Sequence, residues 1–382
     1  MKRKIIIAPD SFKECMTAQE AAKAIERGFR SVFQNEIDIE LIPMADGGEG
    51  TTQSLGDALS GRFHKQVVTG PLGEPVEATF ALSDDKTTAI IEMAEASGLA
   101  LVPREKRNPL IATTYGTGEL IRATLDHGVR KIIIGIGGSA TNDGGAGMME
   151  ALGGVFSDSN GSWLPRGGGA LKNLAQLDLS NLDPRLKEVE ILVACDVDNP
   201  LLGKNGASTI YGPQKGATES MIEELDEALS QYNDVLVKVT GKNVKDVPGA
   251  GAAGGLGTGL MACLNATLEP GVDIVLKETN FRERAKDADL VITGEGRIDN
   301  QTIHGKTPIG VARAAKEMGV KVIALCGTLG KGYEVVHEHG IDAAFSIVQG
   351  PCELQEAIRN GSTYLELLAR NVAMVWKLGE CN

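Results

Sequence analysis

Three short segments of the sequence combine carboxylates with glycine or hydroxyl residues directly after apolar, strand-like runs. They cover residues 10–14 (DSFKE), 46–51 (DGGEGT) and 294–299 (GEGRID). In an open parallel sheet the ligand crevice lies at the carboxyl ends of the strands, where these segments would meet. Backbone N–H groups there can hold phosphate oxygens while carboxylates hold a hard cation. Each single acid could instead be a helix cap, but three such segments together favour a site for Mg²⁺ and a phosphorylated ligand.

The strongest single motif is the glycine-dense segment of residues 137–145, which we call the 137–145 loop. Its sequence, GGSATNDGG, stands directly between a strand-like run and an expected helix at residues 146–152. A helix N-terminus preceded by small hydroxyl residues is a ready anion site, because its N–H groups are unpaired and its dipole is positive there. We therefore expect this loop to hold phosphate groups.

Three other segments imitate nucleotide-binding motifs. Residues 135–140 fit the dinucleotide pattern G-x-G-x-x-A, but no acid clearly ends the next strand. Residues 249–254 fit G-x-G-x-x-G without following a clear strand, which leaves a phosphate loop, a hinge or close helix packing. Residues 304–307 imitate the end of a Walker A motif, although Asn300 stands where its first glycine belongs. Lys306 can still reach a phosphate from the start of the following helix.

The order of the expected elements predicts an α/β fold. A capping box at residues 17–20 opens a helix after the first strand, and alternating strands and helices return in the last hundred residues. Between them, residues 63–93 predict hairpin strands and therefore a mixed sheet. We expect a doubly wound, Rossmann-like parallel-sheet domain formed by both termini, residues 1–61 and 283–382. A second, mixed α/β domain at residues 62–282 would interrupt it, with the active site in the cleft between them.

Composition argues against several classes of protein. The 382 residues include 38 Lys and Arg against 51 Asp and Glu, a formal net charge of −13, so no nucleic-acid or membrane partner is expected. The first apolar run stops at Pro9, too early for a signal peptide, and no run approaches the roughly 18 residues of a membrane span. The six cysteines are far apart and form no CxxC motif, which argues against a zinc or disulfide framework. We therefore expect a cytoplasmic location.

Taken together, the motifs resemble those of the type-1 glycerate kinase family, the bacterial glycerate 2-kinases. The resemblance runs over nearly the whole chain and includes the segments described above. Its further blocks are residues 96–99 (ASGL), 116–120 (GTGEL), 194–196 (ACD) and 251–255 (GAAGG). The resemblance implies transfer of the γ-phosphoryl group of ATP to the 2-hydroxyl group of D-glycerate, giving 2-phosphoglycerate and ADP, with Mg²⁺.

Phosphoryl transfer needs cationic contacts, a bound metal and a carboxylate at the attacking hydroxyl group. We expect Ser11, Lys13 and Arg297 to contact the carboxylate or phosphate of the substrates. Asp46 and Glu49 would hold Mg²⁺, which usually takes one or two carboxylates and keeps several waters. The residues predicted to bind ATP are Gly137, Gly138, Ser139, Thr141, Asn142, Asp143, Glu295 and Lys306.

The catalytic base should be a carboxylate fixed rigidly at the end of an apolar strand. We expect Asp196 in this role and Asp10 as the second candidate, with Lys13 as a further catalytic residue. The alternative for Asp196 is a turn-forming residue before Asn199 and Pro200.

Two other classes of function compete with the kinase. The glycine patterns suggest an NAD(P)-dependent oxidoreductase of a small hydroxy acid, and a non-catalytic, metabolite-binding regulator would bind ligands without turnover. A two-domain layout with glycine-rich loops favours an enzyme that closes over its ligands. The residues themselves leave open a homo-oligomer and the choice between the 2- and 3-hydroxyl groups.

Overall fold

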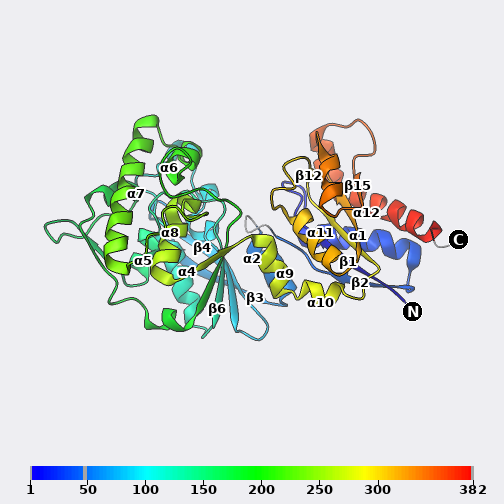
Figure 1. The fold of residues 1–382 in the computed structure, drawn as a ribbon, viewed down its shortest axis with the longest axis horizontal. Helices are drawn as coiled ribbons and strands as arrows, with labels where there is room; N and C mark the ends of the chain where they lie inside the picture. The colour runs from blue at the N-terminus through cyan, green and yellow to red at the C-terminus, as the bar shows by residue number, and fades with distance from the viewer. Residues whose placement is uncertain (1, 46–49, 380–382) are drawn as a thin grey trace. The chain divides into compact units, whose positions relative to one another are not determined.

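The structure of the protein is a computed structural model that describes residues 2–45 and 50–379. Contacts within the chain divide it into two compact units (Figure 1). Unit 1 is discontinuous, because both ends of the chain contribute to it. Unit 1 comprises Met1–Asp46, Gln53–Leu59 and Val272–Asn382, and unit 2 comprises Gly47–Thr52 and Ser60–Gly271.

Unit 1 is built on a five-stranded, fully parallel sheet with the order β15-β13-β11-β1-β2. The last strand of that order, β2, and its neighbour β1 come from the N-terminal part of the chain, whereas the other three come from the C-terminal part. β11 pairs with β1 along its whole length, from Leu290 opposite Ile5 to Gly294 opposite Pro9. The strands are β1 (Arg3–Pro9), β2 (Ile37–Leu41), β11 (Leu290–Gly294), β13 (Lys321–Cys326) and β15 (Ala343–Ser346).

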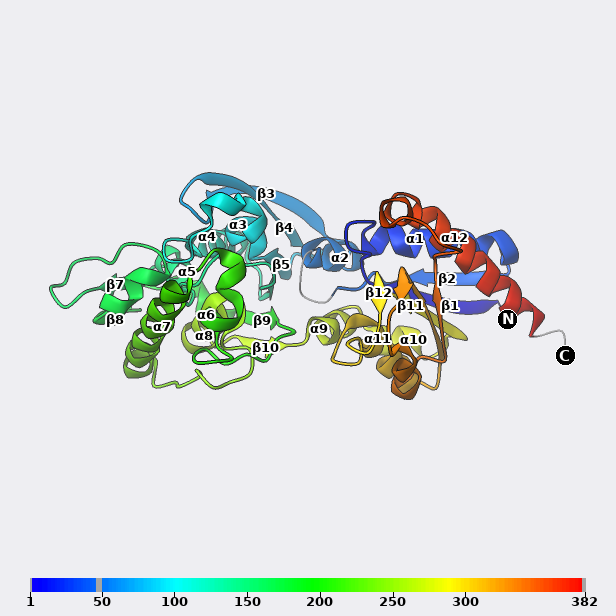
Figure 2. The same cartoon turned by 90° about the horizontal axis from the view of Figure 1, so that it is seen from above.

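Helices cover both faces of this sheet, which confirms the predicted doubly wound, Rossmann-like architecture (Figure 2). Helices α1 and α12 lie together on one face, and α10 and α11 lie on the other. The predicted capping box begins α1: the Thr17 hydroxyl accepts the Glu20 N–H, and the Glu20 carboxylate accepts the Thr17 N–H. The helices are α1 (Ala18–Phe33), α2 (Thr51–Ala58), α9 (Gly271–Glu278), α10 (Phe281–Ala285), α11 (Thr307–Glu317) and α12 (Leu354–Leu378).

The second boundary between the units falls before residue 272, earlier in the chain than the expected position after residue 282. Val272 packs so closely on α11 that a Cβ atom on Gly310 would lie 2.5 Å from its side chain. Phe281 of α10 is fully buried as well. These apolar side chains place α9 and α10 with unit 1, because a helix belongs to the core in which it buries its apolar face.

Unit 2 contains a six-stranded mixed sheet with the order β10-β9-β6-β5-β4-β3. Strands β3, β4 and β5 form the antiparallel hairpins that the sequence predicts, and β5, β6, β9 and β10 run parallel. The parallel strands therefore present their carboxyl ends at one edge. The strands are β3 (Arg62–Thr69), β4 (Pro75–Leu82), β5 (Thr88–Glu92), β6 (Lys131–Gly135), β9 (Glu190–Ala194) and β10 (Thr267–Glu269).

Helices of very different length cover the unit 2 sheet. The longest, α7, is capped by Thr218, whose hydroxyl accepts the Met221 N–H, and it buries the whole of Tyr232 in the core. The helices of unit 2 are α3 (Ala94–Ser97), α4 (Tyr115–Leu125), α5 (Ala146–Ala151), α6 (Ala207–Tyr211), α7 (Glu219–Thr240) and α8 (Ala252–Leu264). Within residues 2–45 and 50–379, no helix has the length and apolar character needed to cross a membrane.

The packing of α1 on α12 depends on a glycine. A Cβ atom on Gly28 would lie 2.6 Å from both the Glu366 carbonyl oxygen and the Ala369 Cβ atom. Gly28→Val should therefore lower the free energy of unfolding by about 1–3 kcal/mol, as overpacking does, measured by urea unfolding. The control is Lys23→Val at an exposed position of the same helix, which should change it by no more than about 0.5 kcal/mol. Equal stability of the two variants would contradict this account.

Candidate active site

The first group of predicted residues lies at the carboxyl edge of the unit 1 sheet. β1 and β11 are neighbours there, while the chain leaves β1 toward β2 on one side and β11 toward β13 on the other. Such a reversal of strand order is where open parallel sheets bind ligands. The Asp10 N–H donates to the Gly294 carbonyl oxygen at 2.8 Å, so the segments that follow the two strands begin side by side.

Asp10 is held in place by short hydrogen bonds. Its side chain is almost fully buried, with the residue 8% exposed. One carboxylate oxygen accepts the Ser11 N–H at 2.6 Å, and the other accepts the hydroxyl of Thr307, the first residue of α11, at 2.6 Å. The carboxylate therefore has a fixed orientation at the edge of the sheet, as a group that acts on a substrate requires.

Glu295 and Lys306 approach each other in the same unit. The Thr302 hydroxyl donates to Glu295 Oε1 at 3.1 Å, and Lys306 Nζ lies 4.0 Å from Glu295 Oε2. Lys306 precedes α11 and keeps 43% of its side chain exposed, so its ammonium group is accessible at the start of that helix. The structure thus brings these two predicted ATP-binding residues together.

Arg297 extends into solvent beside an acid. Its side chain is 64% exposed, and its Nε donates to Asp299 Oδ2 at 2.9 Å. A hydrogen bond from the Gln301 N–H, together with the charges of Lys306 and Arg297, lowers the pKa of Asp299. The Asp299 carboxylate therefore stays ionised and restrains the guanidinium group of Arg297.

Lys13 lies next to the segment that carries Arg297. A Cβ atom on Gly296 would lie 3.6 Å from the Lys13 backbone nitrogen, which places residues 10–14 against residues 294–299. The Lys13 side chain is exposed and makes no hydrogen bond or ion pair with the part of the chain that the structure describes. Unit 1 therefore offers three cations, Lys13, Arg297 and Lys306, beside the carboxylates of Asp10, Glu295 and Asp299.

The second group of predicted residues lies in unit 2, in the 137–145 loop after β6. Only its first part reaches the surface: Gly138 is exposed and Gly137 is half-buried. Ser139 is 6% exposed, and Thr141 and Asn142 are fully buried. The loop thus has an exposed part that can meet a phosphate group and a buried part that supports it.

The Asp143 side chain accepts hydrogen bonds in the interior of unit 2. Its carboxylate accepts the Thr114 N–H at 2.8 Å and the Thr114 hydroxyl at 2.9 Å, and also the N–H groups of Gly145 and Gly147 at 3.1 and 3.2 Å. Burial raises the pKa of Asp143, and these hydrogen bonds oppose the increase. The side chain therefore joins the start of α4 to the start of α5, and its carboxylate does not point toward solvent as a phosphate-binding residue would.

Lys215 is a buried residue that the sequence analysis missed. It is 1% exposed, and its Nζ donates to the Thr141 carbonyl oxygen at 2.6 Å. Burial lowers the pKa of Lys215 to about 7, although the nearby Asp143 carboxylate opposes this change. The available signal was a lone lysine inside the glycine- and proline-rich turn of residues 212–216 (GPQKG).

The glycine pattern at residues 249–254 is a packing device. Ala253, Gly254 and Gly255, at the start of α8, all have positive φ angles. A Cβ atom on Gly254 would lie 2.0 Å from the Thr141 carbonyl oxygen, and the Gly254 carbonyl accepts the Gly144 N–H at 3.0 Å. Of the interpretations open at the sequence level, the structure therefore supports close packing, here against the 137–145 loop.

Two carboxylates at the carboxyl edge of the unit 2 sheet accept backbone N–H groups of the same unit. Asp196, after β9, is exposed, and its Oδ1 accepts the N–H of Gly271, the first residue of α9, at 3.0 Å. Glu92, the last residue of β5, accepts the Thr52 N–H at 2.7 Å and the Gly50 N–H at 3.3 Å. Glu92 was also missed, and its signal was an acid that ends an otherwise apolar strand.

The predicted metal ligands Asp46 and Glu49 lie outside the described residues. Within residues 2–45 and 50–379, no group of three or more His, Cys, Asp or Glu side chains has the arrangement of a metal site. The hypothesis that Asp46 and Glu49 bind Mg²⁺ therefore stays a prediction.

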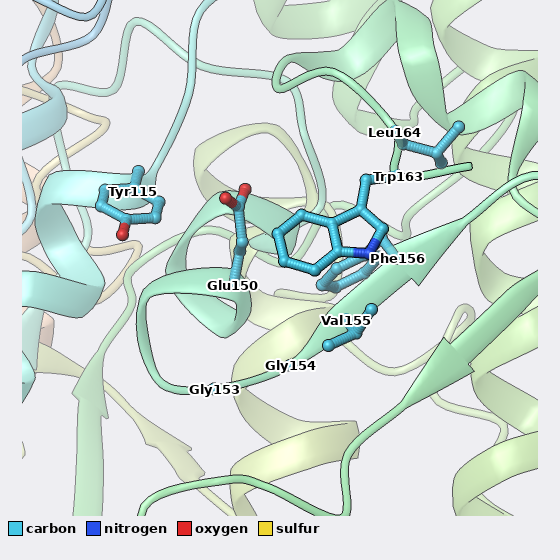
Figure 3. A pocket seen from close by; sticks show the side chains of 8 residues that line it. All are labelled: Tyr115, Glu150, Gly153, Gly154, Val155, Phe156, Trp163 and Leu164. Atoms are coloured by element: carbon cyan, nitrogen blue, oxygen red, sulfur yellow. The ribbon is translucent and has the colours of Figure 1, made fainter. Parts of the chain in front are cut away.

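A cavity of about 290 Å³ opens elsewhere in unit 2 (Figure 3). Trp163, which is 78% exposed, and Phe156 both line this cavity, and Glu150 borders the same space. Arg166 forms an ion pair with Glu150 at 2.9 Å, which neutralises the Glu150 carboxylate. The Arg166 guanidinium group also stacks on the Tyr115 ring. None of the residues that the sequence singled out lines the cavity, which is bordered by Tyr115, Glu150, Gly153, Gly154, Val155, Phe156, Trp163 and Leu164.

Comparison with known proteins gives one consistent result. The model of the glycerate kinase family matches residues 5–377. The chain is 60% identical to a glycerate kinase of Halalkalibacterium halodurans, with 97% of both chains covered, and 54% identical to a glycerate 2-kinase of Escherichia coli, with 99% of both covered. A solved structure from Salmonella typhimurium LT2, described as a glycerate kinase 2, is 50% identical, covers 100% of both chains and has a TM-score of 0.92.

The hydrogen bond between Thr307 and Asp10 can be tested directly. Thr307→Val removes one donor from a buried carboxylate and should lower the free energy of unfolding by about 1–3 kcal/mol in urea unfolding. Thr328→Val, at an exposed position of the same unit, should change it by no more than about 0.5 kcal/mol. If both variants unfold like the unmodified protein, Thr307 does not hold the Asp10 carboxylate.

The burial of Lys215 should make stability depend on pH. Its pKa is lowered from 10.5 to about 7 on folding, so between these values the unfolded chain binds more protons than the folded one. The contribution of Lys215 to the free energy of unfolding is therefore smallest below pH 7 and rises as the pH increases toward 10. Urea unfolding at pH 6 and pH 9 should show a larger gain for the unmodified protein than for Lys215→Met. Equal pH dependence of the two proteins would refute the assignment.

Proposed function

The chain belongs to the glycerate kinase family, and from this premise we propose that it transfers the γ-phosphoryl group of ATP to the 2-hydroxyl group of D-glycerate. The products would be 2-phosphoglycerate and ADP. The observation that carries the proposal is the near-complete coverage of relatives named glycerate kinase and glycerate 2-kinase at 54–60% identity. The two groups of residues described above supply the chemistry that such a transfer needs.

The cations of unit 1 would bind the anionic substrate groups. Lys13 has an accessible ammonium group, and Arg297 presents a guanidinium group that can grip a carboxylate or phosphate with two parallel hydrogen bonds. Ser11 and Glu295 would orient the bound molecules, and Lys306 would contact a phosphate from the start of α11. Positive charge at these points stabilises the charge on the transferring phosphoryl group.

The exposed part of the 137–145 loop would receive the phosphates of ATP. Gly137 and Gly138 have no side chains that could keep a phosphate away from the backbone, and Gly138 has a φ angle of +73° that other residues rarely adopt. Ser139, Thr141, Asn142 and Asp143 would act from beneath, because the structure buries them. This division between contact and support is the role that we propose for the loop.

Asp196 would accept the proton from the attacking hydroxyl group. The Gly271 N–H donates to Asp196 Oδ1 at 3.0 Å and so holds the carboxylate in place, and a general base needs such a fixed position. Asp10 is the second candidate, since its carboxylate is fixed by Ser11 and Thr307. Asp46 and Glu49 would hold Mg²⁺, which neutralises phosphate charge when bound with ATP.

The proposal includes a cytoplasmic enzyme. The five cysteines within the described residues are free thiols, as is usual in a reducing compartment. The net charge of −13 argues against a nucleic-acid partner, and small-molecule substrates suffice for the activity.

The decisive experiment is an assay of ADP release with ATP, D-glycerate and Mg²⁺, coupled directly to enolase, which accepts 2-phosphoglycerate but not the 3-isomer. Signal in the directly coupled assay would support both the kinase activity and attack at the 2-hydroxyl group. ADP release without the enolase signal would overturn the regiochemistry, and the absence of ADP release would overturn the glycerate kinase activity. Omitting Mg²⁺ should abolish turnover.

The role of Asp196 predicts a specific loss. Asp196→Asn keeps an acceptor for the Gly271 N–H, because asparagine also caps helices well, but it removes the base. The turnover number should fall by about 10²–10⁴-fold while circular dichroism stays unchanged. Asp198→Asn, an exposed neighbour, should leave turnover within about two-fold. Turnover of Asp196→Asn within about ten-fold of the unmodified enzyme would remove Asp196 from this role.

A further inference from the structure

The turn of residues 212–216 points one charged side chain into the interior of unit 2. Lys215 ends a single 3₁₀ turn, and the Gly216 and Ala217 N–H groups close the turn onto the Pro213 and Gly212 carbonyl oxygens. Gly216 has a φ angle of +91°, and a Cβ atom there would lie 2.5 Å from the Arg107 carbonyl oxygen. The backbone conformation is therefore fixed, and it delivers the Lys215 ammonium group to the Thr141 carbonyl oxygen at 2.6 Å.

A buried ammonium group is an expensive way to make a structural contact. Transfer of a charge from water into the protein interior costs several kcal/mol, and apolar replacements are often neutral or stabilising. A neutral contact already exists one residue further along: Asn142 Nδ2 donates to the Ser208 hydroxyl at 3.0 Å. Stability alone therefore does not account for a lysine at this position.

The contact is made in the buried part of the 137–145 loop, three residues after the exposed Gly138. Gly254 also packs closely against the Thr141 carbonyl oxygen, and its own carbonyl accepts the Gly144 N–H. The buried Thr141 hydroxyl and the Asn142 Oδ1 atom have no hydrogen-bond partner within the described part of the chain. The position of Thr141 therefore depends strongly on the bond from Lys215.

We propose that Lys215 is a positioning residue for the nucleotide: by holding the Thr141 carbonyl from inside, it fixes the 137–145 loop in the conformation whose exposed residues, Gly137 and Gly138, receive the phosphates of ATP. This inference rests on the function proposed above for the loop. Lys215 itself touches neither substrate.

The test compares Lys215→Met with a matched control, Lys242→Met. Lys242 also lies in unit 2 and donates to a backbone carbonyl, that of Met261 at 3.2 Å, but it does not contact the loop. For Lys215→Met we expect the KM for ATP to rise by at least about ten-fold, while the KM for D-glycerate stays within about two-fold, since a misplaced loop weakens only the contacts it makes. Lys242→Met should keep both values, and Lys215→Arg should recover part of the ATP affinity.

Two readouts do not depend on turnover. Hydrogen exchange of peptides that cover the 137–145 loop should be faster in Lys215→Met than in Lys242→Met, and calorimetric titration with a non-hydrolysable ATP analogue should show weaker binding. If D-glycerate is not phosphorylated by the unmodified protein, the proposed function fails while these two measurements still decide the role of Lys215. Unchanged exchange and unchanged affinity would overturn the inference.

A second variant covers the case in which Lys215→Met does not fold. Ser208 lies in α6, shortly before Lys215 in the chain. Ser208→Ala removes the hydrogen bond that the Ser208 hydroxyl accepts from Asn142, the neighbour of Thr141. It should raise the KM for ATP in the same direction by a smaller factor, again with little change in the KM for D-glycerate. An equal rise in both KM values, or no rise, would count against support of the loop from this side.

Discussion

The pairing of β1 with β11 is the interaction on which the arrangement of unit 1 depends. It joins residues 285 positions apart in the sequence and places Asp10 beside Gly294. Without this ladder of parallel hydrogen bonds, the acids and cations that follow the two strands would have no common location. The Thr307 hydroxyl then locks Asp10 from α11, so three distant parts of the chain determine the orientation of a single carboxylate. The chemistry of unit 1 is thus a consequence of sheet topology, as it generally is for ligand crevices in open parallel sheets.

In unit 2, buried ionisable side chains hold the 137–145 loop in place. The Asp143 carboxylate gathers donors from the starts of α4 and α5, and Lys215 approaches the same loop from the segment after α6. These contacts leave Gly137 and Gly138 at the surface while the rest of the loop is embedded. A loop of small residues would otherwise be mobile, because glycine has many accessible backbone conformations. Contacts in the interior of unit 2 therefore hold the 137–145 loop, and its exposed glycines present their backbone to a ligand.

Local patterns in the sequence predicted the elements and the strand ends well. The capping box at Thr17, the hairpins before β5 and the acids after β1 and β11 were all visible, because each depends on residues close together in the chain. The family resemblance was confirmed over residues 5–377. Sequence patterns did not predict the roles of Lys215 and Glu92, because their hydrogen-bond partners lie 74 and 40 residues away in the chain. For the same reason the sequence did not separate the exposed part of the 137–145 loop from the buried part that contains Asp143.

The interrupted layout of unit 1 also has a consequence for synthesis of the chain. Translation delivers β1, α1 and β2 first, but the partner strand β11 follows only after the whole of unit 2 has been made. Unit 2 is almost contiguous, so it can collapse around its own core while the ribosome is still working, whereas the early strands wait with one unpaired edge. Closure of so long a loop slows formation of the parallel sheet. An exposed, apolar β1 is therefore the segment most in need of chaperone protection on the nascent chain.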